Sequence, residues 1–187
     1  RNARTPVLFP LRLFAAAYTD VFRGIPVVLT IYLIGFGVPA LDLFTGTTRV
    51  AQEFKRRGID VTANDIATYS EVLARCYIAT DERNIDESAL VSALQELNAL
   101  PGQRGYITRT FCEQARFFQP RNGMRIDAVR QAIATRYGET ELYPVLLTAL
   151  LLAADKVDST TGVQMAYLKE WAPRAHNLLT LERPALL

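Results

Sequence analysis

The chain has 187 residues and a formal net charge of +2; 50% of its residues are hydrophobic and 21% are charged. This balance excludes a disordered chain, and the length favours one domain with at most a small appendage. So small a net charge does not by itself indicate a nucleic-acid partner. Two cysteines outside any CxxC pair and one histidine are too few for a zinc site, so we expect two reduced thiols and no metal.

The first 41 residues are basic and apolar. They contain four arginines and one aspartate, and the seventeen residues of Ile25–Leu41 carry no charge. That length is the lower limit for a helix that crosses a bilayer. We therefore expect residues 1–41 to form a separate apolar helical segment, in which residues 15–41 are a candidate membrane contact.

Residues 42–80 predict the first half of an open α/β sheet. The short run VPALDLF, which ends in Asp42 and Phe44, is a plausible strand, and IDVTAND, which ends on Asp65, is a second one. Amphipathic helices are expected after them, over Thr48–Arg57 and Ile66–Ala79. An order of strand, turn, helix and strand within so few residues is typical of an open α/β sheet.

The turn after the first strand and the acid after the second strand indicate a cofactor site. Gly46 allows the backbone to approach a ligand closely, and Asp65 lies nineteen residues further on, at the end of the next strand. A carboxylate there can accept both hydroxyls of a ribose. The dinucleotide pattern G-x-G-x-x-G is absent, which favours a cofactor without phosphates such as S-adenosylmethionine, with Phe44 near its sulfonium. The same residues are equally compatible with a tight turn that binds no ligand.

Residues 81–187 predict a helical lobe. Apolar residues at helical spacing indicate helices over Glu87–Leu97, Leu142–Val157 and Val163–Trp171. Asn122 is expected to cap a further helix that runs to Ala134.

Three separated stretches, DLFTGTTRVAQEFKRRGIDVTANDIATYS from Asp42, GYITRTFCEQARFFQPRNGMRIDAVRQAI from Gly105 and ALLLAADKVDSTTGVQMAYLKEWAPRA from Ala149, resemble the D12-class adenine-specific (N6) DNA methyltransferases. The resemblance covers residues 42–187. It implies the start of a Rossmann-like methyltransferase sheet (residues 42–80) with a large helical insertion (residues 81–187). It also implies S-adenosylmethionine as cofactor, double-stranded DNA as partner and a cytoplasmic location.

The same resemblance implies roles for particular residues. Those expected to line the cofactor site are Asp42, Phe44, Gly46, Thr47, Asp65 and Ile66. Those expected to contact DNA are Arg104, Tyr106, Arg109, Arg116 and Arg121. Taken singly, each arginine could instead lie on a solvated face paired with a glutamate, and Tyr106 could be a core aromatic.

A second resemblance concerns AAAYTDVFRGIPVVLTIYLIGFGVPAL, residues 15–41, which is similar to the membrane permease subunits of polar amino-acid ABC transporters. The two family patterns meet at Ala40–Asp42 without a linker; a gene fusion or a sequence artefact would both produce this. The D-P-P-Y motif that supplies the acceptor chemistry of the methyltransferases is absent, because no Pro-Pro pair occurs. We therefore expect an enzyme fragment that is inactive alone. The alternatives are a permease remnant and a non-catalytic helical binding module.

Overall fold

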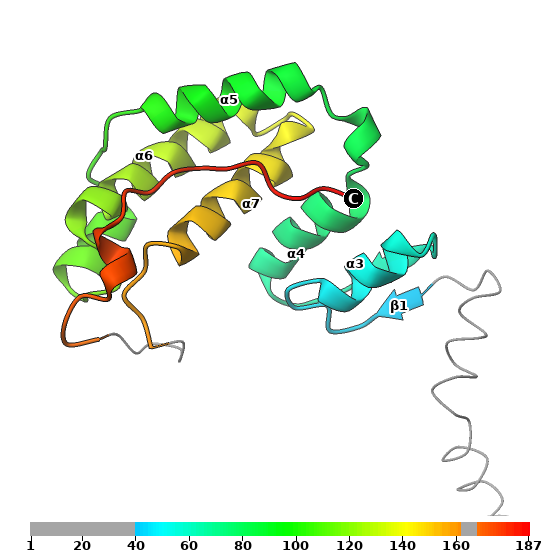
Figure 1. The fold of residues 1–187 in the computed structure, drawn as a ribbon, viewed down its shortest axis with the longest axis horizontal. Coiled ribbons are helices and arrows are strands. Elements are labelled where there is room, and N and C mark those ends of the chain that lie inside the picture. Colours follow the sequence, from blue (N-terminus) through cyan, green and yellow to red (C-terminus); the bar gives the residue numbers. More distant parts are fainter. Residues whose placement is uncertain (1–39, 162–167) are drawn as a thin grey trace, which may run out of the picture.

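The computed structural model describes residues 40–161 and 168–187. Residues 1–39, which hold nearly all of the expected apolar segment, lie outside this part of the chain. The described residues form a small α/β unit and a lobe of longer helices (Figure 1). None of the described helices is long and apolar enough to cross a membrane.

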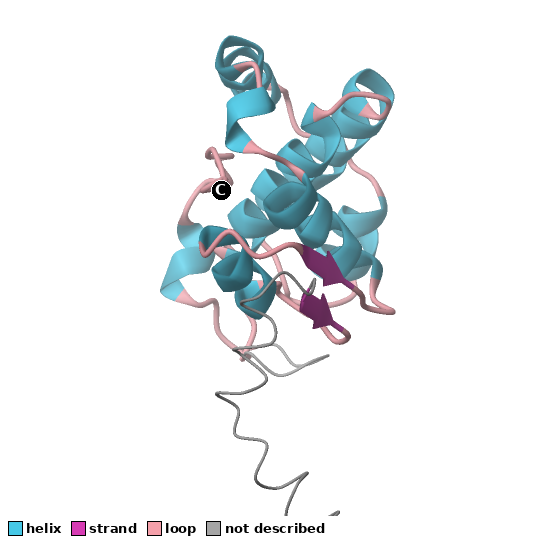
Figure 2. Cartoon of the chain, turned by 90° about the vertical axis from the view of Figure 1, so that its right-hand side faces the viewer, coloured by secondary structure: helices cyan, strands magenta, loops and turns pink. Residues whose placement is uncertain are grey.

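The α/β unit contains two parallel strands, as the sequence predicts. Strand β1, Ala40–Asp42, pairs with β2, Val61–Ala63, so that Ala40 lies opposite Val61 and Asp42 opposite Ala63 (Figure 2). Helix α3, Arg49–Arg56, connects them. The strands are shorter than the apolar runs suggested.

The outer edge of β2 has no partner strand among the described residues. The amides of Ala40 and Asn64 donate to the carbonyls of Asp60 and Asp42. Because bonding direction alternates along a strand, the backbone groups of Val61 and Ala63 point away from β1. One face of the pair is also uncovered, since Leu41 is 61% exposed.

Helix α4, Thr68–Ala74, continues into a π-helical turn, Arg75–Ala79, which confirms the helix expected over Ile66–Ala79. A 3₁₀ turn, Glu82–Asn84, leads into α5, Glu87–Ala99. Asp86 caps α5, because its carboxylate accepts from the amides of Ser88 and Ala89.

The helical lobe is built from α5, α6 (Pro120–Tyr137) and α7 (Leu142–Asp155), with a π-helical turn at Thr108–Glu113 and a 3₁₀ turn at Pro173–His176. Helix α7 is buried over most of its length, as its apolar sequence predicts. It packs with α5 and α6 around a core that includes Leu90, Leu97, Val129, Ile133, Val145 and Leu146.

Two expectations for this lobe were wrong. Helix α6 begins at Pro120, whose fixed φ suits a first helical position, so Gln119 is the N-cap and Asn122 lies within the first turn. Of the helix expected over Val163–Trp171, residues 163–167 lie outside the described part, and residues 168–171 are not helical.

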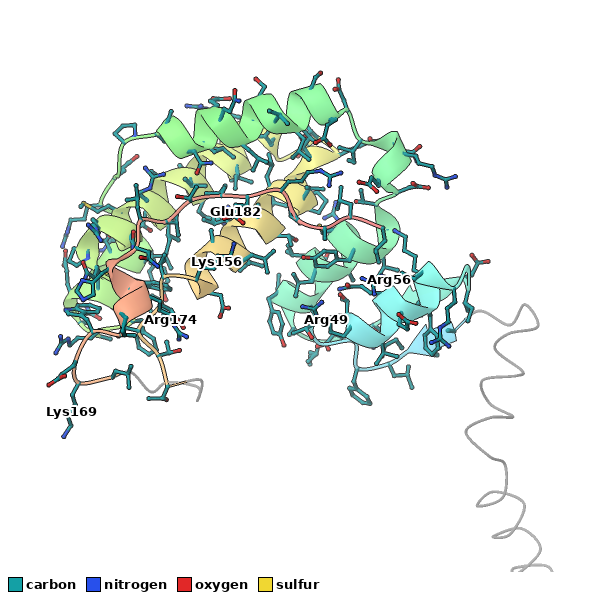
Figure 3. The ribbon with its side chains drawn as sticks, viewed as in Figure 1. Arg49, Arg56, Lys156, Lys169, Arg174 and Glu182 are labelled. Carbon is teal, nitrogen blue, oxygen red and sulfur yellow. The ribbon has the colours of Figure 1, made fainter. Side chains whose placement is uncertain are left out.

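Asn122 instead holds the C-terminal strap, residues 177–187, which crosses the helices in extended form (Figure 1). The Asn122 amide accepts from the backbone of Leu179 and donates to that of Asn177. Asn98 bonds both backbone groups of Leu181. Lys156 and Glu182 add an ion pair between α7 and the strap, visible in Figure 3.

Candidate functional site

The turn at the carboxyl end of β1 has a left-handed backbone at two positions. Gly46 has φ 48° and Thr48 has φ 64°. A Cβ at Gly46 would meet no atom within 4 Å, so the space above this glycine is open, while the backbone conformation still disfavours any other residue. The amide of Thr48 donates to the carbonyl of Thr45 at 2.6 Å and closes the turn.

Asp65 joins this turn to the end of β2. One carboxylate oxygen accepts from the Gly46 amide at 2.9 Å, and the other accepts from the Ala67 amide at 2.9 Å. These hydrogen bonds from Ala67 and Gly46 lower the pKa of the Asp65 carboxyl, so it is ionised at neutral pH. A carboxylate has about four lone-pair positions, so Asp65 can still accept hydrogen bonds from a ligand.

The other predicted cofactor residues lie around this contact with different surroundings. Asp42 is half-buried at the end of β1, and its Oδ2 is buried with no hydrogen-bond partner among the described residues. Phe44 is 89% exposed, and Thr47 and Ile66 are also exposed. Exposed apolar side chains beside an unsatisfied carboxylate oxygen are an arrangement that a ligand could complete.

A cleft of about 520 Å³, here called the strand-edge cleft, lies between the outer edge of β2 and α4. Asp65 and Ile66 line it, whereas Asp42, Phe44, Gly46 and Thr47 do not. Sequence reasoning missed two further lining residues, Thr45 and Ser70. Their buried hydroxyls have no hydrogen-bond partner among the described residues, and only the position of Thr45 in FTGTT hinted at a role.

The predicted DNA-contacting arginines mostly have partners within the chain. Arg104 forms two hydrogen bonds to Glu113, both at 2.7 Å. Arg116 lies 4.8 Å from the centre of the Trp171 ring, and Arg121 donates to the carbonyl of His176. Arg109 is exposed, and its side chain forms no hydrogen bond or ion pair with the described residues. Sequence alone did not distinguish Arg109 from the others.

Asp127 organises the segment between α5 and α6. Its carboxylate accepts from the amides of Gly105, Ile107 and Thr108 and from the Thr108 hydroxyl, at 2.6 to 2.9 Å. A Cβ at Gly105 would lie 2.6 Å from Asp127 Cγ, so this close approach requires glycine. The Asp127 contacts fix the backbone of Tyr106, whose side chain is 62% exposed and does not belong to the core.

A second and larger cleft, of about 780 Å³, lies between α4 and the helical lobe and is called the interlobe cleft here. Its floor is apolar and includes Val72, Ile126, Leu147 and Leu150. Polar and aromatic side chains line it as well: Tyr69, Gln103, Tyr106, Arg130 and Gln131. Among these residues only Tyr106 was predicted as a functional residue, because the cleft joins segments that are distant in the sequence.

Comparison with known proteins assigns the family. Residues 36–186 match the D12 class N6 adenine-specific DNA methyltransferases, and the chain belongs to this family. It is 40% identical over 153 residues to the type II methyltransferase M.NlaIII of Neisseria lactamica, covering 78% of this chain and 45% of that protein. It is 31% identical over 145 residues to the type II methyltransferase M.CviAII of Paramecium bursaria Chlorella virus 1, covering 72% of this chain and 42% of that protein.

The chain therefore spans less than half the length of these curated relatives. No solved structure matches. The family match begins at residue 36, six residues before the boundary expected from the sequence. The comparisons give no support to the transporter resemblance of residues 15–41. Within the described residues, no group of three or more His, Cys, Asp or Glu side chains could hold a metal ion.

Proposed function

We propose that this chain provides the cofactor-binding and DNA-contacting part of a site-specific DNA methyltransferase that transfers a methyl group from S-adenosylmethionine to adenine N6. The observation that carries the proposal is the contact between Asp65 and Gly46 at the carboxyl end of two parallel strands. Ligands of open α/β sheets bind at this edge. A DNA substrate would place the chain in the cytoplasm.

The donor groups at this edge fit S-adenosylmethionine. Asp65 has lone pairs left for ribose hydroxyls. The Oδ2 of Asp42 is buried without a described partner, so Asp42 would bind the ammonium group only after that oxygen becomes accessible. Phe44 would lie near the sulfonium, Ile66 would cover the adenine, and the open backbone at Gly46 and Thr47 would let the ligand approach. The cofactor, when bound, supplies the methyl group; these residues bind and orient it.

The exposed strand edge supports a larger, Rossmann-like sheet in the whole enzyme. Parallel sheets are normally covered on both faces and contain several strands. Here Val61 and Ala63 present backbone groups that pair with no strand in the described part of the chain, and Leu41 is 61% exposed. We propose that residues 42–80 are the cofactor half of such a sheet and that residues 81–187 are its helical insertion.

The helical lobe supplies the proposed DNA contacts through Arg104, Tyr106, Arg109, Arg116 and Arg121. Arg109 and Tyr106 are the most available of these, since their side chains are exposed and form no hydrogen bond or ion pair with the described residues, although the Tyr106 ring touches that of Phe111. Arg104, Arg116 and Arg121 would have to leave or share their present partners to bind a phosphate.

We propose that the acceptor chemistry of the enzyme lies outside these 187 residues. The adenine amino group is a weak nucleophile, and the family resemblance assigns its activation to a D-P-P-Y motif. The chain contains no Pro-Pro pair. We therefore expect these residues to bind cofactor and DNA without transferring the methyl group, unless the missing motif is supplied from outside them.

Calorimetric titration with S-adenosylmethionine tests the proposal. We expect Asp65→Ala to weaken binding by about tenfold or more, because a hydrogen bond to a charged group contributes about 1.5–3 kcal/mol. Asp86→Ala is the matched control: it also removes a carboxylate that accepts backbone amides, and it lies outside the proposed site.

Equal affinities of the wild type and the Asp65→Ala variant would contradict the assigned site. No measurable binding by a folded wild-type chain would instead favour the non-catalytic helical module. The same preparation is incubated with tritiated cofactor and duplex DNA. Tritium in the DNA would contradict the expectation that these residues are inactive alone.

A further inference from the structure

We propose that the interlobe cleft holds one unstacked nucleotide of the DNA substrate, and that this nucleotide is a recognition contact distinct from the adenine that is methylated. The inference rests on the proposed function and adds to it a specific subsite. It is carried by the composition of the cleft, by the charge of the surrounding segment and by the hydrogen bonds of Asp127.

The segment that forms one wall of the cleft is strongly basic. Residues 100–137 contain seven arginines and two carboxylates, whereas the whole chain has a net charge of only +2. Both carboxylates are already engaged, Glu113 by Arg104 and Asp127 by its own backbone contacts. The excess positive charge therefore remains available to a polyanion, which favours DNA over an apolar protein partner as the occupant.

The cleft offers the groups that bind a nucleotide outside a helical stack. Tyr69 from α4 and Tyr106 from the helical lobe line it, and 51% and 62% of their surfaces are exposed. The Tyr106 ring makes an edge-to-face contact with Phe111, with ring centres 5.8 Å apart, and its exposed part remains accessible for stacking on a base. Arg130 is exposed and has no hydrogen bond or ion pair with the described residues, which leaves it available for a phosphate. The apolar floor, which includes Leu147, would exclude water from the base.

The same cleft lacks what methyl transfer to an amino group requires. Asp127 is its one carboxylate, and it already accepts four hydrogen bonds from residues 105–108, as many as a carboxylate has lone-pair positions. It therefore offers no free carboxylate to accept the hydrogens of an adenine amino group. It does offer the side-chain amides of Gln103 and Gln131, which can donate to and accept from base edges. These groups suit recognition of a base and not its chemical activation.

Binding of two short duplexes of the same sequence tests this inference. One duplex is fully paired, and the other carries one bulged nucleotide, which avoids most of the cost of unpairing. We expect the 187-residue chain to bind the bulged duplex more tightly. Tyr106→Ala should weaken that complex by about tenfold, as expected for the loss of one base–aromatic stack, and should remove most of the preference for the bulged duplex. Tyr106→Phe should retain the preference, because it keeps the ring.

Arg130→Ala should weaken both complexes and reduce the slope of log affinity against log salt by about 1. Arg136→Ala is the control, since Arg136 lies on the same helix but is paired with Glu96 away from the cleft. A 5-iodouracil at the bulge should cross-link to Tyr106 or Tyr69 on irradiation.

Equal wild-type affinities for the two duplexes, or cross-links outside the interlobe cleft, would overturn the inference and leave the proposed function intact. Absence of binding to either duplex would overturn both the inference and the DNA-binding part of the proposed function. Calorimetric titration with S-adenosylmethionine tests the cofactor site independently of these DNA-binding results, because Asp65 and the other proposed cofactor residues lie outside the interlobe cleft.

Discussion

At the scale of single residues, Asp127 shows how one carboxylate can fix a segment that has little regular structure. Residues 100–107 lie between two helices and have few backbone partners of their own. Asp127 accepts from the amides of Gly105 and Ile107 and, at the next residue, from both the amide and the hydroxyl of Thr108. Burial opposes ionisation, but the hydrogen bonds from Thr108, Ile107 and Gly105 outweigh it and hold the pKa of Asp127 below its ordinary value.

We expect Asp127→Asn to destabilise the chain by about 2 kcal/mol at pH 7, because an amide replaces a charged acceptor. The folded-state pKa is lowered, so the ionised carboxylate stabilises the fold above the ordinary value of about 3.9. This contribution is lost as the pH falls through the folded-state pKa. The difference between variant and wild type in urea unfolding should therefore shrink from pH 7 to pH 3.

Asp60→Asn serves as control for this measurement, because Asp60 is exposed and its carboxylate forms no hydrogen bond with the described residues. A difference between Asp127→Asn and wild type that stays constant over the pH range would show that charge is not the source of the stabilisation.

At the scale of elements, the C-terminal strap is an extended segment without a neighbouring strand. The side-chain amides of Asn98 and Asn122 provide the hydrogen bonds that a neighbouring strand would otherwise provide, because each of them donates to and accepts from the backbone of the strap. Between and beside these contacts, Leu179, Leu181 and Leu186 enter the core of the lobe. The strap therefore closes the lobe on one side, and its two asparagines set its register.

Asn122→Ala should cost roughly 2–4 kcal/mol of unfolding free energy, because it leaves the Leu179 amide and the Asn177 carbonyl without their partner. Asn98→Ala should cost less, about 1–2 kcal/mol, because Asn98 is only half-buried. Urea unfolding gives these values, and hydrogen exchange should show faster exchange at the Leu179 and Leu181 amides.

Asn84→Ala, an exposed asparagine whose side chain forms no hydrogen bond with the described residues, should change stability by less than about 0.5 kcal/mol. If Asn122→Ala were as mild as this control, the strap would be held by its leucines and not by the asparagine contacts.

At the scale of the whole molecule, the α/β unit and the helical lobe share one hydrophobic core. Cys76, from the π-helical turn after α4, belongs to the same buried cluster as Leu146 and Leu150 of α7. Lys55 of α3 donates to the carbonyls of Tyr77 and Thr80, which ties α3 to that turn. The α/β unit that carries the proposed cofactor site therefore packs against the helical lobe and is not an independent domain.

A shared core predicts one cooperative unfolding transition. Trp171, the single tryptophan, reports on the helical lobe, and a Phe54→Trp change in a Trp171→Phe background reports on α3. We expect the two fluorescence signals and far-ultraviolet circular dichroism to give the same urea midpoint. A lower midpoint for the α3 reporter would show that the α/β unit unfolds separately.

The sequence predicted both strands of the α/β unit and placed Gly46 and Asp65 after them, because these features follow from short-range patterns. Short apolar runs identified β1 and β2, and parallel strands bring their carboxyl ends together, which is where the structure shows the Gly46 amide bonded to Asp65. Asn122 was misassigned because asparagine is a good N-cap in general, while Pro120 two residues earlier determines where α6 begins.

The clefts were beyond sequence reasoning for a different reason. The residues that line the interlobe cleft range from Tyr69 to Ala154 in the sequence. No local sequence pattern predicts which helix faces pack together when they are so far apart in the chain. For the same reason the sequence could not tell that Arg104 is paired while Arg130 is free of hydrogen bonds and ion pairs within the described residues.

The outer edge of β2 also predicts that the purified chain will tend to aggregate at high concentration. Among residues 40–161 and 168–187, the outward amides and carbonyls of Val61 and Ala63 have no strand partner, and they are a template on which a second molecule can extend the sheet sideways. Exposed Leu41 and Phe44 nearby would strengthen such growth. Aggregation of the purified chain would then reflect an incomplete sheet and not a failure of the helical lobe to fold.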